Sequence, residues 1–258
     1  MPIRTNLGGP KRGREQLAEW QRFQNWIDDR SNSAWAFRGL GDTGFPLVPT
    51  IGRLDPYSFS REQAVLEAFR RRVSQFIDDS NFGDWDYLAL AQHHGLPTRL
   101  LDWTTNPLVA AYFAVMASPG AINVEVAGKL TLVVPPQEDV ACRIVARRVR
   151  NADVIDPTSD SDPFAIAGIR FALPRTISTR IASQNGLFSI HAQPDQPWTP
   201  VSAKPADVFD IPGSARGFFQ RRLFYLGIDA LYIMGGLDGL GQRLAWQARR
   251  SIGLGAIK

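Results

Sequence analysis

The chain has 258 residues, 44% of them hydrophobic and 21% charged, and its 29 Lys and Arg residues outnumber 25 Asp and Glu residues, giving a formal net charge of +4. This composition is typical of a folded globular protein and excludes an intrinsically disordered chain. The mildly basic balance is ordinary for a soluble protein, and it also suits a phosphate-rich partner such as DNA or RNA.

The sequence predicts a cytoplasmic protein without a bound metal or a membrane segment. Its one cysteine, Cys142, has no partner for an internal disulfide and no neighbouring ligands for a zinc site. The first residues have no apolar core of the kind found in signal peptides, and no run of about 18 apolar residues predicts a membrane span. A reducing compartment fits this pattern.

The N-terminal part of the chain predicts a tail, a helix and a strand. Residues 1–13 are rich in Gly, Pro and basic residues, so we expect a flexible tail there. Apolar residues recur at helical spacing over residues 14–30, which predicts an amphipathic helix. A short apolar strand over residues 34–37 then ends at Arg38, and the Gly and Pro residues of segment 41–56 predict a loop.

Three further helices are expected before residue 118. Ser60 resembles the first residue of a capping box and opens one helix. The next helix covers residues 84–94 and ends before a glycine, the residue type that commonly follows a last helical turn. Asn106 followed by Pro107 predicts the start of a third helix, because Pro at the first helical position loses no hydrogen bond.

The C-terminal half alternates short strands, helices and loops. Strands are expected at residues 129–134, 187–191 and 230–233, helices at residues 215–226 and 237–249, and loops at residues 151–163 and 194–212. This alternation predicts an α+β or mixed α/β domain. Of the two we expect an α+β fold with a mixed central sheet and packed helices, in a single domain over residues 14–258.

The most informative segment of the chain is residues 84–114. It places two adjacent histidines, Arg99, Asp102 and two threonines between apolar segments. Polar groups at this density are costly to bury without partners and unnecessary on a surface. The segment therefore predicts a site.

Five motifs follow one another along the chain: FRG at residues 37–39, QHHGLPTRLLDWT at residues 92–104, AAYFA at residues 110–114, an R…QNGLF pattern over residues 180–188 and LDGL at residues 237–240. Together they resemble the FRG domain family, which is named for its Phe-Arg-Gly motif. The resemblance covers residues 34–245, and its central motif is long and specific.

A weaker resemblance connects the same segments to ADP-ribosyltransferases of the arginine–serine–glutamate class. Residues 36–39 look like the Arg-Gly strand end of that class, and residues 103–105 look like its Ser-Thr-Ser strand, followed by an Ala…Phe helix. The resemblance implies an ADP-ribosyltransferase-like fold and NAD as substrate. It also implies a toxin or phage-defence protein that modifies a nucleic acid or a protein, and that is accompanied by a neutralising partner protein.

The resemblance implies roles for particular residues. Arg38 and Gly39 would hold the NAD phosphates, since arginine offers a fixed bidentate fork; Arg99 is a second phosphate-binding candidate. Thr104 and Thr105 would hold the nicotinamide ribose. The remaining cofactor-binding candidates are Asn106, at the start of a helix with free N–H groups, and Tyr112.

The catalytic carboxylate of that class is missing from its expected strand. The strand over residues 184–190 contains no Glu or Asp, and Gln184 stands at about the expected position. A glutamine can orient a ribose hydroxyl but cannot act as a base. Asp102 is the alternative carboxylate, with His93 or His94 as its acid–base partner. If neither serves, the chain is a non-catalytic nucleotide-sensing module; a metal-free nuclease is a third hypothesis.

These candidates also have purely structural explanations. Adjacent helical positions point about 100° apart, so at most one of His93 and His94 faces a site. Arg99 and Asp102 can form a buried salt bridge that holds the turn in place. The threonines can cap the following helix, and Tyr112 can belong to the core.

Overall fold

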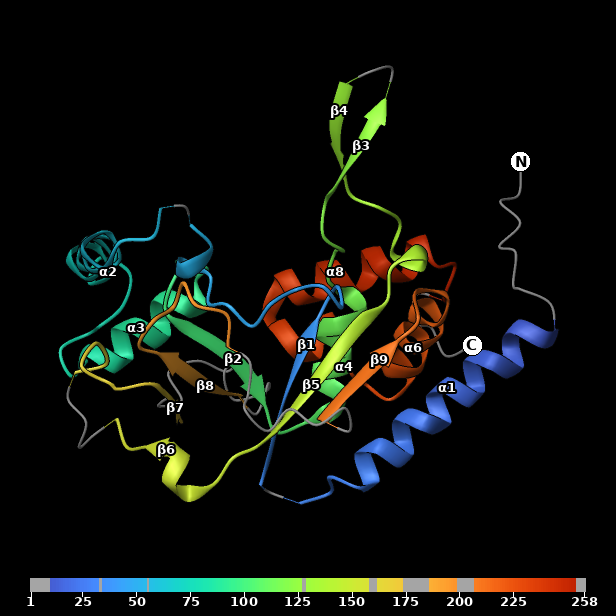
Figure 1. Cartoon of the computed structure of the whole chain (residues 1–258), viewed down its shortest axis with the longest axis horizontal. Coiled ribbons are helices and arrows are strands. Elements are labelled where there is room, and N and C mark those ends of the chain that lie inside the picture. The colour runs from blue at the N-terminus through green and yellow to red at the C-terminus, as the bar shows by residue number, and fades with distance from the viewer. Residues whose placement is uncertain are drawn as a thin grey trace.

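The computed structural model describes most of the chain. The described residues are 10–32, 34–54, 56–126, 129–157, 162–173, 186–198 and 207–253. They form a mixed sheet with helices packed on it and a separate hairpin that projects from the body (Figure 1). The α+β class with a mixed central sheet is therefore confirmed.

The sheet has seven strands in the order β6-β7-β8-β2-β1-β5-β9. Only β6 and β7 are parallel; the other neighbours are antiparallel. The strands are β1 (Trp35–Leu40), β2 (Leu100–Thr104), β5 (Cys142–Arg148), β6 (Val154–Ile155), β7 (Ile169–Ala172), β8 (Gly186–His191) and β9 (Val208–Ile211). The projecting hairpin is made of β3 (Ile122–Val126) and β4 (Lys129–Val133).

The helices cover the sheet in two groups. Helices α1, α4 and α6 share one core cluster with β1, β5 and β9, whereas α2 and α3 pack over β2, β7 and β8. The helices are α1 (Pro10–Asp28), α2 (Phe59–Val73), α3 (Asp84–His93), α4 (Pro107–Met116), α6 (Gly213–Tyr225), α7 (Ala230–Met234) and α8 (Gly236–Arg249). The described residues also contain three short 3-10 turns: η1 (Ile51–Arg53), η2 (Gln137–Asp139) and η3 (Asn151–Asp153).

The end of α3 and the start of α4 agree with the boundaries predicted from the local sequence. Helix α3 ends at His93, and Gly95 takes the positive φ of 82° that glycine tolerates best. The side chain of Asn106 accepts a hydrogen bond from the backbone N–H of Leu108 at 2.9 Å, so it caps α4 as the Asn-Pro pair predicts.

Other boundaries differ from the expectations. Helix α1 begins at Pro10, four residues before the expected start. Strand β1 continues to Leu40, so Arg38 lies inside a strand and not at its end. The residue that caps α2 is Ser58, whose extended backbone lets its hydroxyl accept from the N–H of Arg61 at 3.1 Å. The capping box expected at Ser60 is therefore wrong.

Several C-terminal elements also differ. Residues 230–233, expected as a strand, form helix α7, because Asp229 accepts from the N–H of Tyr232 at 3.1 Å and caps a helical turn. Strands β3, β5, β7 and β9 were not predicted. β9 lies inside the expected loop at residues 194–212, and η3 with β6 lies inside the expected loop at residues 151–163.

Helix α4 packs unusually closely on β1, and Gly39 is the residue that permits this. A Cβ built on Gly39 would overlap the backbone of Ala110 and Ala114 in α4. The neighbouring Phe37 faces the same helix and is buried in the cluster shared with it. The absence of a side chain at Gly39 therefore sets the distance between sheet and helix.

The C-terminal end of α4 is held by a buried arginine. Arg216 of α6 is 1% exposed and donates to the main-chain carbonyls of Gly41 at 2.9 Å, Ala114 at 3.1 Å and Ala117. Burial lowers the pKa of its guanidinium, whereas Cys142 and Asp42 oppose that shift. The carbonyls at a helix C-terminus carry partial negative charge, which compensates a buried cation.

In the described part of the chain, no helix combines the length and the apolar character that crossing a membrane requires.

Replacing Gly39 by alanine is expected to destabilise the fold by about 1–3 kcal/mol, because the added methyl group has no room against α4. Urea unfolding measures the change. The matched control is Gly13→Ala on exposed α1, where the added Cβ meets nothing within 4 Å and helix propensity gains about 1 kcal/mol at most. Equal stability of the Gly39→Ala variant and the wild type would contradict the packing argument.

Candidate functional site

Strands β1 and β2 separate next to Arg38. They share a single register pair, Phe37 with Thr104, whereas β1 pairs with β5 along its whole length. In place of further ladder bonds, Nη1 of Arg38 donates to the main-chain carbonyl of Asp102. The same Nη1 lies 3.8 Å from Oδ2 of the Asp102 carboxylate. The arginine thus occupies the place where the two strands separate.

A cavity of about 250 Å³ opens at this place. Its wall combines charged, polar and aromatic side chains from β1, α3, β2 and α4, with one residue just after α4. The lining residues are Phe37, Arg38, Gly39, Gln92, His93, Asp102, Trp103, Thr104, Ala110, Phe113 and Ala117. The structure therefore brings together five of the predicted site residues: Arg38, Gly39, His93, Asp102 and Thr104. We call this cavity the strand-junction cavity.

The carboxylate of Asp102 is oriented and still accessible. Nε2 of Gln92 donates to Oδ2 of Asp102 at 2.9 Å, and Oε1 of Gln92 accepts from the buried hydroxyl of Thr98 at 2.6 Å. The Asp102 side chain remains 55% exposed. A carboxylate held in one direction but open to solvent can accept a proton from a bound molecule.

Sequence reasoning did not single out Gln92, although it is the first residue of the central motif. Its role depends on two contacts, with Asp102 and Thr98, and the contact with Asp102 requires α3 to lie beside β2. The motif itself was therefore the available signal for this residue.

Arg38 is a mostly buried cation with spare hydrogen-bonding capacity. Its side chain is 16% exposed, and its buried Nε has no hydrogen-bond partner among the described residues. Burial lowers the pKa of the guanidinium; the carboxylate of Asp102 opposes this shift, and the charge of Arg53 adds to it. An arginine nevertheless stays protonated in proteins, so the cavity contains a fixed positive charge.

One of the two adjacent histidines lines the cavity. His93 belongs to the lining, whereas His94 is exposed at the end of α3 and is not part of it. Their rings meet edge to face with centroids 4.9 Å apart. This arrangement agrees with the expectation from helical geometry that at most one of the pair faces a site.

Arg99 does not reach the cavity, so its expected role in phosphate binding is wrong. Its guanidinium forms a bidentate pair with Glu62, with Nε–Oε1 at 2.9 Å and Nη2–Oε2 at 2.8 Å. Both side chains are 2% exposed. The alternative salt bridge with Asp102 is wrong as well, because Glu62 of α2 takes that place and joins α2 to the start of β2.

The other predicted binding residues have different positions. Thr104 lines the cavity, and its hydroxyl accepts from the N–H of Asn106 at 3.0 Å. The side chain of Asn106 is used for capping α4, and Thr105 is exposed after the end of β2. Tyr112 lines a second cavity on another side of α4. Gln184 lies outside the described residues, so its expected role stays a prediction.

A buried polar chain supports the aromatic wall of the strand-junction cavity. Nε1 of Trp103 donates to the hydroxyl of Ser189 at 2.9 Å, and this hydroxyl lies 3.0 Å from Nε2 of His191. His191 is fully buried and packs against Trp198. Burial, and to a smaller degree the charge of Arg38, lower the pKa of His191 to about 4. His191 is therefore neutral at physiological pH.

The described residues give the strand-junction cavity neither a metal-binding cluster nor a reactive thiolate. Among the described residues, no three His, Cys, Asp or Glu side chains are placed to hold a metal ion. Cys142 is fully buried in the core, and burial raises the pKa of its thiol to about 12, so it does not supply a thiolate.

One comparison with known proteins bears on this site. The FRG domain matches residues 33–120. This segment contains β1, α3, β2 and α4 and every lining residue of the strand-junction cavity. The match supports the resemblance to the FRG family over this part of the chain. No curated protein and no solved structure matches the chain.

Removing one partner of the buried Arg99–Glu62 pair is expected to destabilise the protein by about 3–5 kcal/mol, because the other charge is left unpaired. Urea unfolding of Arg99→Met measures this change, and the double variant Arg99→Met/Glu62→Leu is expected to recover most of it. The exposed pair Arg71–Glu67 is the control, where Arg71→Ala costs at most about 1 kcal/mol. A double variant no more stable than the single one would contradict this account.

Acid is expected to destabilise the protein partly through His191. The pKa of His191 falls from the ordinary 6.5 to about 4 on folding. As the pH is lowered, the unfolded chain therefore takes up a proton at His191 before the folded protein does. The resulting stability is present above pH 6.5 and is lost as the pH falls towards 4, by about 3 kcal/mol. His191→Gln does not titrate, so its unfolding free energy is expected to fall less over this range. Identical pH profiles for the two proteins would contradict the assignment.

Proposed function

We propose that the chain is an ADP-ribosyltransferase that binds NAD in the strand-junction cavity and transfers ADP-ribose to a nucleic acid or protein acceptor. The observation that carries the proposal is the placement of a fixed arginine and an accessible, oriented carboxylate in one cavity, within the segment matched by the FRG domain. A dinucleotide with a pyrophosphate and a reactive ribose requires both kinds of group.

Arg38 would bind the pyrophosphate. Its buried Nε is without a hydrogen-bond partner among the described residues, and charge-assisted bonds from a guanidinium to phosphate oxygens are strong and directional. The aromatic rings of Phe37, Trp103 and Phe113 give apolar surface for the nicotinamide ring. Thr104 adds a hydroxyl near the point where the strands separate.

Asp102 would take the place of the absent glutamate. In the proposed reaction, the bond between C1′ of the ribose and the nicotinamide nitrogen breaks, and the bonding electrons leave with nicotinamide. The acceptor oxygen or nitrogen then bonds to C1′ and passes its proton to the Asp102 carboxylate. Gln92 positions this carboxylate, as a carboxylate is positioned against an oxocarbenium-like state in glycosidases. His93, in the same cavity, is the group that could then carry the proton to solvent.

The proposed ADP-ribosyltransferase-like architecture has support in the order of the elements. The arginine-bearing β1 lies directly beside β2, whose last residue is Thr104, and α4 follows immediately. This is the order that the resemblance in the sequence implies.

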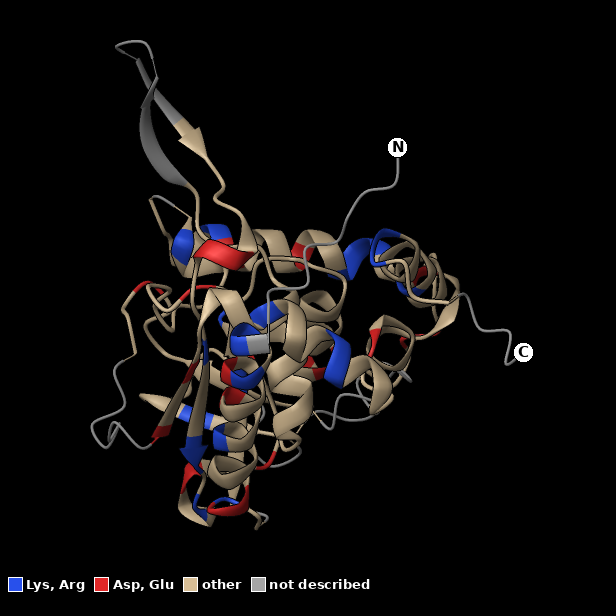
Figure 2. Ribbon diagram, turned by 90° about the vertical axis from the view of Figure 1, so that its right-hand side faces the viewer, with Lys and Arg blue, Asp and Glu red and all other residues tan. Residues whose placement is uncertain are grey.

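The charge distribution of the described residues suits a nucleic acid acceptor and a protein acceptor alike. Several of the arginines that suit a nucleic acid are paired with neighbouring carboxylates, as in Arg70–Asp84 at 3.0 Å and Arg150–Asp153 at 3.2 Å. Figure 2 also shows basic and acidic residues interspersed along the ribbon. Charge alone therefore does not select DNA or RNA over a protein acceptor.

A nucleotide-sensing module without turnover is the second candidate. The observation that favours it is the position of Asp102, whose Oδ2 already accepts from Gln92 and lies 3.8 Å from Arg38. A carboxylate that stays bound to Gln92 and Arg38 would help to form the binding site but would not accept a proton from the ligand.

Purified protein incubated with labelled NAD is expected to release nicotinamide and to transfer label to DNA, RNA or lysate protein supplied separately. Arg38→Ala is expected to slow NAD consumption at least about 100-fold, because it removes the fixed cation. Arg148→Ala, an exposed arginine on the adjacent strand β5, is the matched control and should retain full activity. NAD consumption that survives the loss of Arg38 would contradict the assignment.

Asp102→Asn separates the two candidates. For a transferase, the turnover rate is expected to fall about 10²–10⁴-fold while the affinity for NAD is kept. The reason is that the amide has the shape of the carboxylate but cannot act as a base. A sensing module would bind NAD in calorimetry without releasing nicotinamide in either form.

A transferase acting on cellular polymers would also be toxic, and a neutralising partner protein is part of this proposal. Expression in bacteria is expected to arrest growth with the wild type and not with Arg38→Ala, as colony counts would record. Equal toxicity of the two forms, at equal protein levels, would argue against a toxic activity in the strand-junction cavity.

A further inference from the structure

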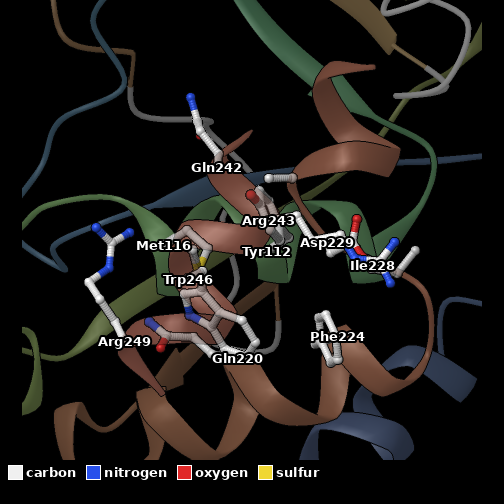
Figure 3. Close-up of a pocket in the computed structure, with 11 residues that line it drawn as sticks. Tyr112, Met116, Gln220, Phe224, Ile228, Asp229, Gln242, Arg243, Trp246 and Arg249 are labelled. Atoms are coloured by element: carbon white, nitrogen blue, oxygen red, sulfur yellow. The ribbon is translucent and has the colours of Figure 1, made fainter. Parts of the chain in front are cut away.

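A second cavity, which we call the α8 cavity, lies between α4, α6 and α8 and has a volume of about 170 Å³ (Figure 3). Each helix contributes residues three or four positions apart, which lie on one helix face: Tyr112 and Met116, Gln220 and Phe224, and Arg243 and Trp246. Apart from the two residues of α4, this lining lies outside the segment matched by the FRG domain.

Three aromatic rings line the α8 cavity. The rings of Phe224 and Trp246 lie 5.1 Å apart at 35°, and the guanidinium of Arg243 lies over the Phe224 ring at 5.3 Å. Tyr112 adds a third ring from α4. Flat π surfaces of this kind bind planar rings.

The buried carboxylate and the buried amide side chain of the cavity, Asp229 and Gln220, already have hydrogen-bond partners. The Asp229 carboxylate accepts from the N–H of Tyr232 at 3.1 Å and pairs with Nε of Arg243 at 3.2 Å. Oε1 of Gln220 accepts from Arg250 at 2.7 Å, while its Nε2 donates to the carbonyl of Val115 at 2.8 Å. A ligand therefore finds few free acceptors for its own donor groups.

Donors, by contrast, remain available. The buried Nε1–H of Trp246 has no hydrogen-bond partner within the described part of the chain. Tyr112 is 9% exposed, and burial together with the Asp229 charge raises the pKa of its phenol to about 12, so it keeps its proton. The exposed Arg249 adds a positive charge at the edge of the cavity, as Figure 3 shows.

We propose that the α8 cavity is a binding site for a small aromatic ring that carries an anionic group. The ring lies against the aromatic side chains, and the anion accepts hydrogen bonds from Trp246 and Arg249. This site is separate from the strand-junction cavity and does not depend on the proposed reaction there.

Isothermal titration of the full chain tests the proposal with two anionic probes, indole-3-carboxylate and AMP, and with their uncharged counterparts, indole and adenosine. We expect at least one anionic probe to bind more tightly than its uncharged counterpart. Preference for indole-3-carboxylate identifies an aromatic carboxylate as the ligand, and preference for AMP identifies a nucleotide.

Two variants assign the binding to the α8 cavity. Trp246→Phe removes one N–H and keeps a ring, and Arg249→Ala removes an exposed charge; each is expected to weaken binding about tenfold. Leu237→Ala, on the same helix and 85% exposed, is the matched control without effect. Arg38→Ala should also leave the affinity for the probes unchanged. This variant therefore distinguishes probe binding in the α8 cavity from probe binding in the strand-junction cavity.

Three results would overturn the proposal. They are the absence of binding by both anionic probes at about 1 mM, equal affinity for the charged and uncharged probes, and unchanged affinity in both cavity variants. Thermal unfolding of Trp246→Phe and Arg249→Ala, compared with the wild type, establishes that the variants are folded.

Discussion

Helix α4 lies directly on β1 because Gly39 has no side chain, and the positions of both cavities depend on this contact. The close approach brings Ala110 and Phe113 to the junction of β1 and β2, where they complete the wall around Arg38. The same helix presents Tyr112 towards α8. A side chain at Gly39 would push α4 outward and change both walls together.

At the opening between β1 and β2, a side chain takes the place of a ladder hydrogen bond. A sheet that separates normally exposes unpaired ladder groups, which is unfavourable in a buried place. Here the guanidinium of Arg38 donates to the carbonyl of Asp102 in place of an amide from the neighbouring strand. One residue therefore both stabilises the opening and supplies its positive charge.

Contacts between neighbours in the sequence were predictable, and contacts between distant segments were not. The end of α3 before Gly95 and the start of α4 at Asn106 follow from local capping and backbone conformation. The partner of Arg99 is Glu62, 37 positions earlier in the chain, and nothing in the spacing identifies it. Asp102 is the obvious neighbour in the sequence but not in space.

Short apolar runs were ambiguous for a related reason. Residues 230–233 have the composition of a strand, but they form a helix that Asp229 caps. For the strand-junction cavity, two separate motifs predicted Arg38, His93 and Asp102, and the elements that carry them, β1, α3 and β2, meet in space. These motifs did not predict which face of α4 carries Tyr112.

Arg216 has a consequence for how the molecule opens. Its guanidinium donates to the carbonyls of Gly41, Ala114 and Val140. The first two of these residues are more than 70 positions apart in the chain, and the last two are more than 25 positions apart. If this one side chain moves out of its position, the end of α4, the turn after β1 and the segment before β5 all lose a hydrogen-bond donor at the same time. Amide hydrogens in these three segments should thus share one opening free energy in hydrogen exchange, although they are distant in the sequence.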